Sequence, residues 1–593
     1  MIKRLAVIFQ SLPFGLFVYT VGNILYIAML SVLPAEIIIA EEYGLLARLG
    51  LMVFSLIWLS RYYREFKVKI EGIELGLLAF YLIPILIRFP LVYPTHDDLA
   101  YHFMAGDYAS RVFHDNNFMS TAWGSYFYPA VDLGYTWFLK ILGIRWTIAL
   151  LYLIISIWLT SIASRWRAIA KNRLQKFLLL VVFMVLPYVP HQIATTGTLM
   201  VDYFALVIVL EATYLATAKT TNKTLAALTM GMAILIKQSA GIFVLPIFLY
   251  YLWQNRRKIN WLIVILAAGV SSLYFVRLYL ETGNPVMGLY NGIFQSPLFP
   301  LSNFTNRIFG PQNIWQMTVW PIIGQFSDRF GEGMVAPIAK VFFAPLPILG
   351  YVGTMIMSWR TKSWQYVSVV LSYFLWSVLT GYSRYYLALN AIAVIMLVGE
   401  IRHIPKWFSG LGKKRYVILA IIAIGGASSL KTDLSWRPNP SIRTPAANAY
   451  FLEKYREGLL LLGRDTVGAS SLEYRKIFED NEAVIMVYRG PVTYVAYMAY
   501  LNGLPVVSGV TTSQYDSLLS SKKISPNIKN NLQQVKSMKK VILLTDNSYE
   551  SQINDLDILK SFACQKRGKI GRDKYFQRDD YFGETWIYDC QKK

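Results

Sequence analysis

Two adjacent aspartates, Asp97 and Asp98, are the residues whose type and spacing most directly suggest chemistry in this sequence. Neighbouring carboxylates repel each other, so one of the two can hold its proton more tightly than usual and be poised as a general base. A structural role is the alternative, because Thr95 or Asp97 can cap a helix that starts near Leu99. The surrounding segment, HDDLAYH, also contains His96, Tyr101 and His102.

A divalent metal site is a second interpretation of this segment, because histidine and carboxylate side chains are common metal ligands. The spacing of His96, His102 and the aspartates does not form a compact ligand motif such as HExxH. We therefore expect no metal and no required cofactor, and keep metal binding as the weaker alternative.

Two cations, Lys237 and Arg384, lie in or beside apolar runs. A charged residue at membrane depth costs about 2.5–3.5 kcal/mol on insertion scales, so it usually faces a cavity and has a function. A leg from residue 225 to 236 rises only about 18 Å, which places Lys237 in a recess below the outer surface. The alternative is a lysine that snorkels to the interface. Arg384 is followed by Tyr385, and Asp202 opens another apolar run.

The elements that must position these residues are hydrophobic. Of the residues, 55% are hydrophobic and 16% are charged, whereas soluble domains have about 45–50% and about 25%. This composition excludes an ordinary soluble enzyme and a disordered chain. We predict an α-helical polytopic membrane protein with about 13 transmembrane helices. The predicted spans are 6–33, 44–60, 73–93, 145–163, 176–190, 199–218, two short legs within 225–253, 261–279, 336–358, 364–381, 385–401 and 416–430.

The basic residues fix the expected orientation. The net charge is +23, and the basic residues of the first 430 positions lie mostly in short loops between apolar runs. The positive-inside rule then places the N-terminus in the cytoplasm of a multi-pass protein of the cytoplasmic (inner) membrane. The long loops 94–144 and 280–335 fall outside, together with all the candidate residues above. Nucleic-acid binding is excluded, because no basic helix or aromatic-basic platform occurs.

The first 430 residues form the predicted transmembrane catalytic domain, and residues 431–593 are predicted to form a small periplasmic or extracellular α/β domain. Short apolar segments such as AVIMVYRG, LPVVSGV, KKVILLTDN and FGETWIYDC are its candidate strands. Its Cys564 and Cys590 are the two cysteines of the sequence. Outside the cytoplasm they can form a disulfide, and the alternative is two buried thiols. In the loop 280–335, Trp315 and Trp320 indicate an interfacial helix that anchors the chain or guards substrate entry.

Six segments in order resemble motifs of the GT-C superfamily of glycosyltransferases that use lipid-phosphate sugars. They are HDDLAYH, YPAVDLGYTWFLKILG, TGTLMVDYFAL, MGMAILIKQSAG, TGNPV and GYSRYYLAL, within about residues 70–400. The set is most similar to the protein mannosyltransferase and lipid A aminoarabinose transferase branch. The resemblance implies that Asp97 is the catalytic base and that Asp98 takes a position often held by glutamate. It also implies that Asp202 is a second acidic site residue and that Lys237 and Arg384 bind the donor phosphate.

The expected function is transfer of a sugar from a polyprenyl-phosphate donor to an extracytoplasmic hydroxyl of a lipid, glycan or protein acceptor. A glycan ligase or polymerase that uses the same carrier is one alternative. A lipid transporter or flippase is another, although transporters often show internal repeats and the two halves of this sequence do not.

Overall fold

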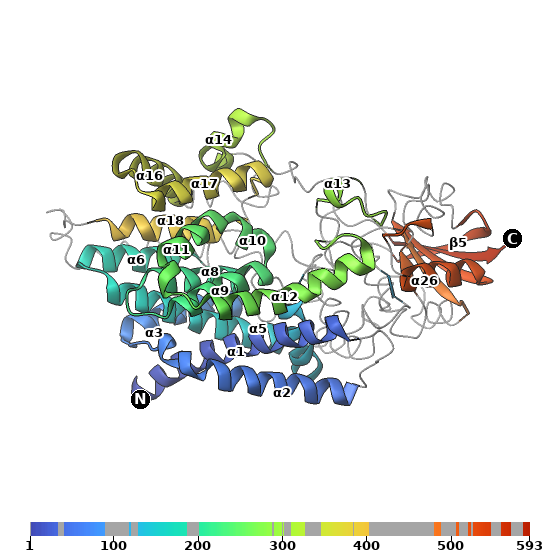
Figure 1. Ribbon diagram of the computed structural model, residues 1–593, viewed down its shortest axis with the longest axis horizontal. Helices are drawn as coiled ribbons and strands as arrows, with labels where there is room; N and C mark the ends of the chain where they lie inside the picture. Colours follow the sequence, from blue (N-terminus) through green and yellow to red (C-terminus); the bar gives the residue numbers. More distant parts are fainter. Residues whose placement is uncertain are drawn as a thin grey trace.

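The computed structural model contains a bundle of helices with a β-sheet at one end (Figure 1). It describes residues 2–33, 41–88, 118–119, 128–186, 201–286, 290–298, 301, 310–326, 345–382, 385–401, 480–487, 506–508, 520–523, 526–546, 559–570 and 585–593. Several sequence predictions lie outside these residues: His96, Asp97, Asp98, Tyr101, His102, Arg384 and the span 416–430.

The helices of the N-terminal third follow the predicted spans with one difference. Where the sequence predicts a long loop over 94–144 followed by a span at 145–163, the structure has one continuous helix of 40 residues from Ala130 to Ile169. No proline interrupts this stretch, and its glycines at 134 and 143 weaken a helix without ending it. The elements are α1 (Ile2–Val32), α2 (Glu41–Leu59), the 3-10 helix η1 (Ser60–Phe66), α3 (Gly72–Arg88), α5 (Ala130–Ile169) and α6 (Arg173–Val185).

The helices of the next third also match predicted spans, including the two legs. The region 225–253 is not one helix but two, α9 and α11, joined by the short helix α10. The start of α9 lies beside the start of α12, because the Asn260 N–H donates to Thr224 Oγ1 over 2.8 Å. The elements are α8 (Asp202–Thr217), α9 (Lys223–Ile236), α10 (Gln238–Phe243), α11 (Leu245–Asn255), η6 (Arg256–Lys258), α12 (Trp261–Thr282), α13 (Asn291–Phe294), α14 (Ile314–Ile323), η7 (Gly324–Phe326), α16 (Pro345–Thr361), α17 (Trp364–Leu379) and α18 (Leu387–Gly399).

Several of these helices are suited to a membrane. Within the described residues, four are long and apolar enough to cross one: Arg4–Val32, Gly44–Phe66, Trp146–Ile169 and Trp261–Thr282. Five shorter apolar helices accompany them, at Gly72–Leu86, Lys223–Ile236, Ile314–Ile323, Trp364–Leu379 and Leu387–Gly399. The chain is thus mostly helical with several membrane-span candidates, and the number of thirteen crossings stays a prediction.

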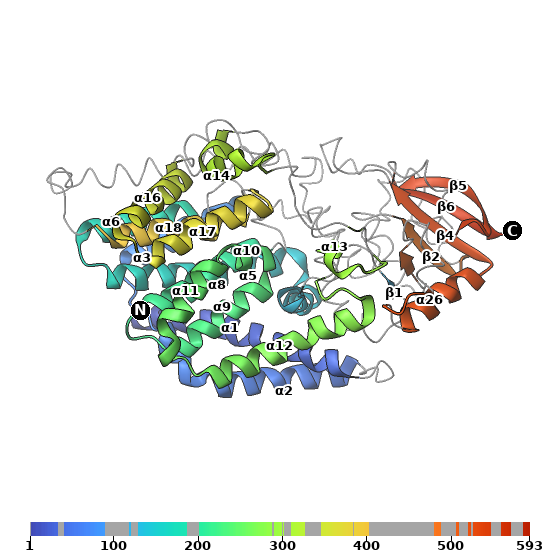
Figure 2. The same cartoon turned by 45° about the horizontal axis from the view of Figure 1, so that its top comes forward.

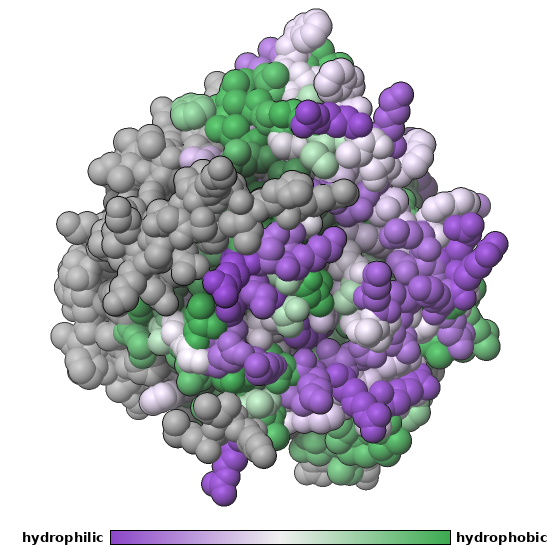
Figure 3. Space-filling view, turned by 90° about the vertical axis from the view of Figure 1, so that its left-hand side faces the viewer, coloured by the Kyte–Doolittle hydropathy of each residue, from purple (hydrophilic) through white to green (hydrophobic). Residues whose placement is uncertain are grey.

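The end of the bundle opposite the sheet is basic. Figure 3 shows hydrophilic residues gathered on this face. Hydrogen bonds join distant segments here: Asn172 Nδ2 to the Ile401 carbonyl over 2.9 Å, and Arg165 Nη1 to the Glu65 carbonyl over 3.0 Å. Exposed cations lie in and beside the connections α2–α3, α5–α6, α11–α12 and α16–α17: Arg61, Arg64, Lys67, Lys69, Lys171, Arg173, Lys176, Arg256, Arg257, Lys258, Arg360 and Lys362.

The sheet at the other end has the strand order β1-β3-β2-β4-β6-β5 (Figure 2). Its strands are β1 (Phe118–Met119), β2 (Ala483–Val487), β3 (Val506–Ser508), β4 (Lys540–Asp546), β5 (Phe562–Ile570) and β6 (Thr585–Lys592). Strands β1 to β4 pair in parallel, and β6 is antiparallel to both β4 and β5. Helix α26 (Pro526–Ser537) precedes β4.

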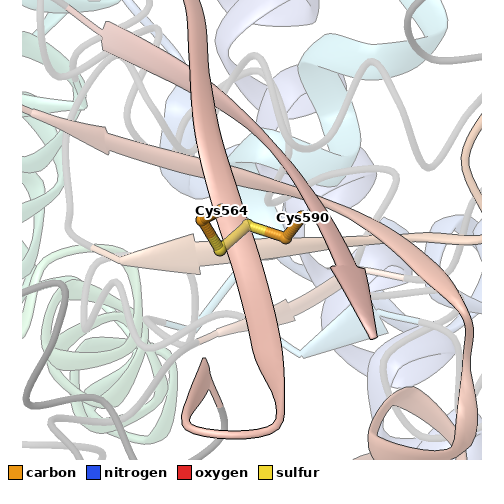
Figure 4. The surroundings of a disulfide bond; sticks show 2 residues. All are labelled: Cys564 and Cys590. Carbon is orange, nitrogen blue, oxygen red and sulfur yellow. A yellow bond between two sulfur atoms is a disulfide. The ribbon is translucent and has the colours of Figure 1, made fainter. Parts of the chain in front are cut away.

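Four of these strands lie in the apolar segments that the sequence singles out, and two do not. β5, FACQKRGKI, is too polar to stand out as a strand. β1 comes from the first long loop, far from the others in the chain. In the sheet, Cys564 and Cys590 are direct partners on β5 and β6, and they are joined by a disulfide (Figure 4). We call strands β2 to β6 with α26 the C-terminal module.

Candidate functional site

Lys237 lies at a break between two helices, α9 and α10. α9 ends at Ile236, and Lys237 has an extended conformation with φ −147° and ψ 99°. Its N–H still donates to the Ala233 carbonyl over 3.2 Å, and its carbonyl accepts from Gly241 over 3.0 Å, so it ends one helix and begins the next. The 14 residues of α9 rise only about 21 Å. α9 is therefore shorter than the roughly 30 Å hydrocarbon core of a membrane.

Gly241 explains how α10 can fold back onto α9. A Cβ atom at this position would lie 2.5 Å from the Ile234 Cα atom and 2.6 Å from Ile234 Cγ1. Real Cβ atoms do not approach backbone so closely, so only glycine fits here. The glycine of the segment IKQSAG thus sets the turn that presents Lys237.

The ammonium of Lys237 forms an ion pair with Asp202. Lys237 Nζ lies 2.5 Å from Asp202 Oδ1, and the two side chains are 12% and 8% exposed. Asp202 is the first residue of α8, where the positive end of a helix dipole favours a carboxylate. Replacement of either residue by a neutral one would leave the other as an uncompensated buried charge, which destabilises the folded protein.

An aromatic side chain covers the same ammonium. Lys237 Nζ lies 5.2 Å from the centroid of the Tyr385 ring, within the range of a cation–π contact. Two further rings flank Tyr385: Tyr382 at 5.1 Å in an edge-to-face arrangement and Phe243 of α10 at 6.2 Å. The cation is thus held by residues from three parts of the chain.

The turn between α17 and α18, which carries Tyr385, is fixed from two sides. Trp376 of α17 donates its indole N–H to the Tyr382 carbonyl over 2.9 Å and stacks on Tyr386 at 4.4 Å. From the other side, Trp320 of α14 donates to the Gly381 carbonyl over 2.5 Å. Gly381 has φ +60°, and a Cβ there would lie 2.3 Å from Pro311 Cδ. The turn therefore needs glycine at this position.

The structure brings together three of the residues singled out from the sequence, Asp202, Lys237 and Tyr385. Asp97, Asp98, His96, Tyr101, His102 and Arg384 lie outside the described residues, so their roles and the metal alternative stay predictions. Sequence reasoning missed the role of Trp320 as a partner of the 381 turn. The sequence does not indicate that Trp320 contacts Gly381, because the two residues are 61 positions apart and belong to no common motif.

Comparisons with known proteins give two structural matches. Two crystal structures of ArnT from Cupriavidus metallidurans are similar to this chain, one bound to undecaprenyl phosphate and one in the apo state. The bound structure has a TM-score of 0.41 and 13% identity, and the match covers 87% of this chain and 97% of ArnT. The apo structure has a TM-score of 0.42 and 12% identity, with 87% and 98% coverage. No family model and no curated protein sequence matches this chain.

ArnT is a GT-C lipid A aminoarabinose transferase, a member of the branch that the sequence motifs resemble. The chain is thus similar in structure to a protein of that branch. At this level of identity the similarity concerns the fold alone.

Proposed function

We propose that this protein is a membrane glycosyltransferase that moves a sugar from a polyprenyl-phosphate donor to a hydroxyl group outside the cytoplasm. The observation that supports the proposal most is the buried Lys237, paired with Asp202 and covered by Tyr385 at a helix break. An ammonium at this depth is costly, and a phosphorylated lipid is the ligand that would use it. A lipid-linked donor reaches such a depth, because its chain lies in the membrane.

Lys237 is proposed to bind the donor phosphate, together with Arg384 three positions after Gly381. An ammonium carries three N–H donors, so contact with a phosphate oxygen does not require Asp202 to leave. Asp202 would hold the ammonium in place, while the covering ring of Tyr385 keeps water away from it.

In the proposed reaction the acceptor oxygen attacks the anomeric carbon while Asp97 takes the hydroxyl proton. The bond between the anomeric carbon and the phosphate oxygen breaks, and the bonding electrons leave with polyprenyl phosphate. The nearby cations stabilise the negative charge that develops on this leaving group. Direct displacement inverts the configuration at the anomeric carbon.

The proposed orientation puts the basic end of the bundle in the cytoplasm and the sheet outside. It is supported by the hydrophilic residues on the end of the bundle opposite the sheet (Figure 3) and by the exposed cations in the connections between helices. The site, the two long loops and the C-terminal module then share the outer side.

The experiment that tests the function is an incubation of the purified protein in nanodiscs with a panel of polyprenyl-phosphate sugars and envelope extracts. We expect release of polyprenyl phosphate with one donor, and at least about a hundredfold slower release after Asp97→Asn, as for loss of a general base. Undiminished turnover of Asp97→Asn would remove this mechanism. Movement of intact donor across the bilayer without carrier release would instead indicate a flippase.

A further inference from the structure

The C-terminal module contacts both long loops that precede it in the chain. Lys523, just before α26, donates through Nζ to the Phe294 carbonyl over 3.0 Å and to the Gln295 carbonyl over 3.2 Å. β3 pairs in parallel with β1, with Phe118 opposite Val506 and Met119 opposite Val507. Residues 294–295 belong to the loop after α12, and β1 belongs to the loop that carries Asp97.

Hydrogen bonds among side chains and backbone fix the described part of the 282–298 loop after α12, which is residues 282–286 and 290–298. Asn291 bonds the Ser296 backbone twice, since its Oδ1 accepts from the N–H and its Nδ2 donates to the carbonyl, each over 2.8 Å. Ser296 Oγ donates to the Thr282 carbonyl over 2.5 Å, and Asn284 Nδ2 donates to Asn291 Oδ1 over 3.2 Å. All four side chains are almost fully buried. This network holds the carbonyls of Phe294 and Gln295 at fixed positions.

Close packing at Gly283 is a second contact between the module and this loop. Gly283 ends α12 with φ +74°, and its N–H donates to the Tyr279 carbonyl over 2.7 Å. A Cβ there would lie 3.0 Å from both the Cβ atom and the carbonyl oxygen of Lys523. The backbone of the module thus lies directly against the end of α12.

The direction of the strands agrees with this docking. The C-terminus lies at the end of the sheet that is far from the helices in Figures 1 and 2. β6 ends there, and β4 runs antiparallel to it, so the carboxyl ends of β4 and of its parallel neighbours β2 and β3 point toward the bundle. β3 is the last strand of the module on this side of the sheet, and its free edge pairs with β1.

We propose that the C-terminal module positions the first long loop for catalysis: it docks on the 282–298 loop through Lys523 and offers the edge of β3 to residues 118–119. Pairing with β3 fixes residues 118–119, which lie within the connection between α3 and α5. The connection is then held at a third point as well as at its two ends. A segment held at three points has fewer conformations than one held only at its ends. Less conformational entropy is therefore lost when it is ordered for the reaction. Lys523 and Gly283 are thus positioning residues, and this part of the proposal rests on the proposed function.

Strand pairing can be tested with engineered cysteines in the full chain. Phe118→Cys with Val506→Cys joins direct partners on neighbouring strands. Neighbouring strands lie about 4.8 Å apart, within the roughly 4.4–6.8 Å between Cα atoms that a disulfide requires. The control, Phe118→Cys with Ser508→Cys, is two residues out of register. We expect peptide mapping to find the first cross-link in most molecules and the second in few. Equal yields, or no cross-link in the first pair, would overturn the proposal.

Docking is tested by Lys523→Met in this cross-linking background and in the otherwise native chain. We expect a lower yield of the 118–506 cross-link and at least about fivefold slower carrier release, as for loss of a charge-assisted hydrogen bond. Lys592→Met, an exposed lysine at the far end of β6, should leave both unchanged. Gly283→Ala should act like Lys523→Met, whereas Gly269→Ala, with open space around it in α12, should not.

The two proposals fail in distinguishable ways. A protein that releases no carrier from any donor but forms the 118–506 cross-link in a Lys523-dependent way would contradict the glycosyltransferase and retain the docking. Normal cross-linking and normal turnover in Lys523→Met would overturn the positioning role while the transferase stands.

Discussion

Trp320 donates its indole N–H to the carbonyl oxygen of Gly381 over 2.5 Å, although 61 residues separate them. This bond ties a helix of the second long loop to the turn that carries Tyr385. Tyr385 in turn covers the ammonium of Lys237, which pairs with Asp202. The surface helix and the buried ion pair therefore belong to one connected set of contacts.

Replacement of Trp320 by phenylalanine keeps an aromatic ring and removes the donor to Gly381. We expect the turn to loosen and the KM for the lipid-linked donor to rise about fivefold, with a smaller change in kcat, as for loss of one buried hydrogen bond. Trp315→Phe is the matched control, because Trp315 lies on the same helix and is 80% exposed. Steady-state carrier release measures both, and equal behaviour of the two variants would contradict this role.

Gly241→Ala should move Lys237. The new methyl group would collide with the backbone of Ile234, so α10 must shift away from α9. Gly231→Ala adds the same methyl group to α9 where nothing lies within 4 Å, and should leave the protein unchanged or slightly more stable. We expect at least about tenfold slower carrier release for the first variant only, the size of effect that a misplaced binding group gives.

The helix break could be predicted from the sequence, because an uninterrupted span at 225–253 would place the cluster Arg256–Lys258 on the wrong side. The helix positions could also be predicted, since apolar runs of membrane length carry their own signal. The gathering of basic residues at one end of the helix bundle could be predicted from the positive-inside rule.

Other features could not be predicted, because their partners are distant in the chain. β5 is a polar edge strand whose position is set by pairing with β6, and its own residues indicate no strand. β1 is a strand of two residues that exists only through its pairing with β3. The pairing of Lys237 with Asp202 required knowledge of how α8 packs on α9, which periodicity alone does not give.

A second buried ion pair, at the basic end, should matter for stability. Arg165 and Glu211 are 4% and 0% exposed, and Arg165 Nη1 donates to Glu211 Oε1 over 2.8 Å. Trp158 also donates to this carboxylate over 2.8 Å. Glu211→Gln should lower the free energy of unfolding by about 3–5 kcal/mol, because the arginine would remain buried without its counter-charge.

The exposed pair of Lys69 and Glu71 is the control for Glu211. Their side chains are 83% and 54% exposed, and Lys69 holds the pKa of Glu71 below its usual range by hydrogen bonding. Such surface pairs contribute little, so Glu71→Gln should leave the Tm in detergent almost unchanged. A Tm of Glu211→Gln that matches the wild type would show that the buried pair contributes nothing.

The disulfide should stabilise the module. Cys564 and Cys590 are 26 residues apart in the chain, and closure of a loop of this size contributes about 3.5 kcal/mol in the chain-entropy model. Cys564→Ser, or mild reduction, should therefore speed proteolysis within residues 540–593 while the helices stay protected. Unchanged cleavage rates would indicate that strand pairing alone holds β5 to β6.

The central claim is that the ammonium of Lys237 binds the phosphate of a lipid carrier. Native mass spectrometry of the protein titrated with polyprenyl phosphate tests it most directly, with Lys237→Met compared with the wild type and with Trp315→Phe. We predict at least about tenfold weaker binding for Lys237→Met, equal to about 1.4 kcal/mol, and unchanged binding for Trp315→Phe. Equal affinity of Lys237→Met and the wild type would contradict the claim.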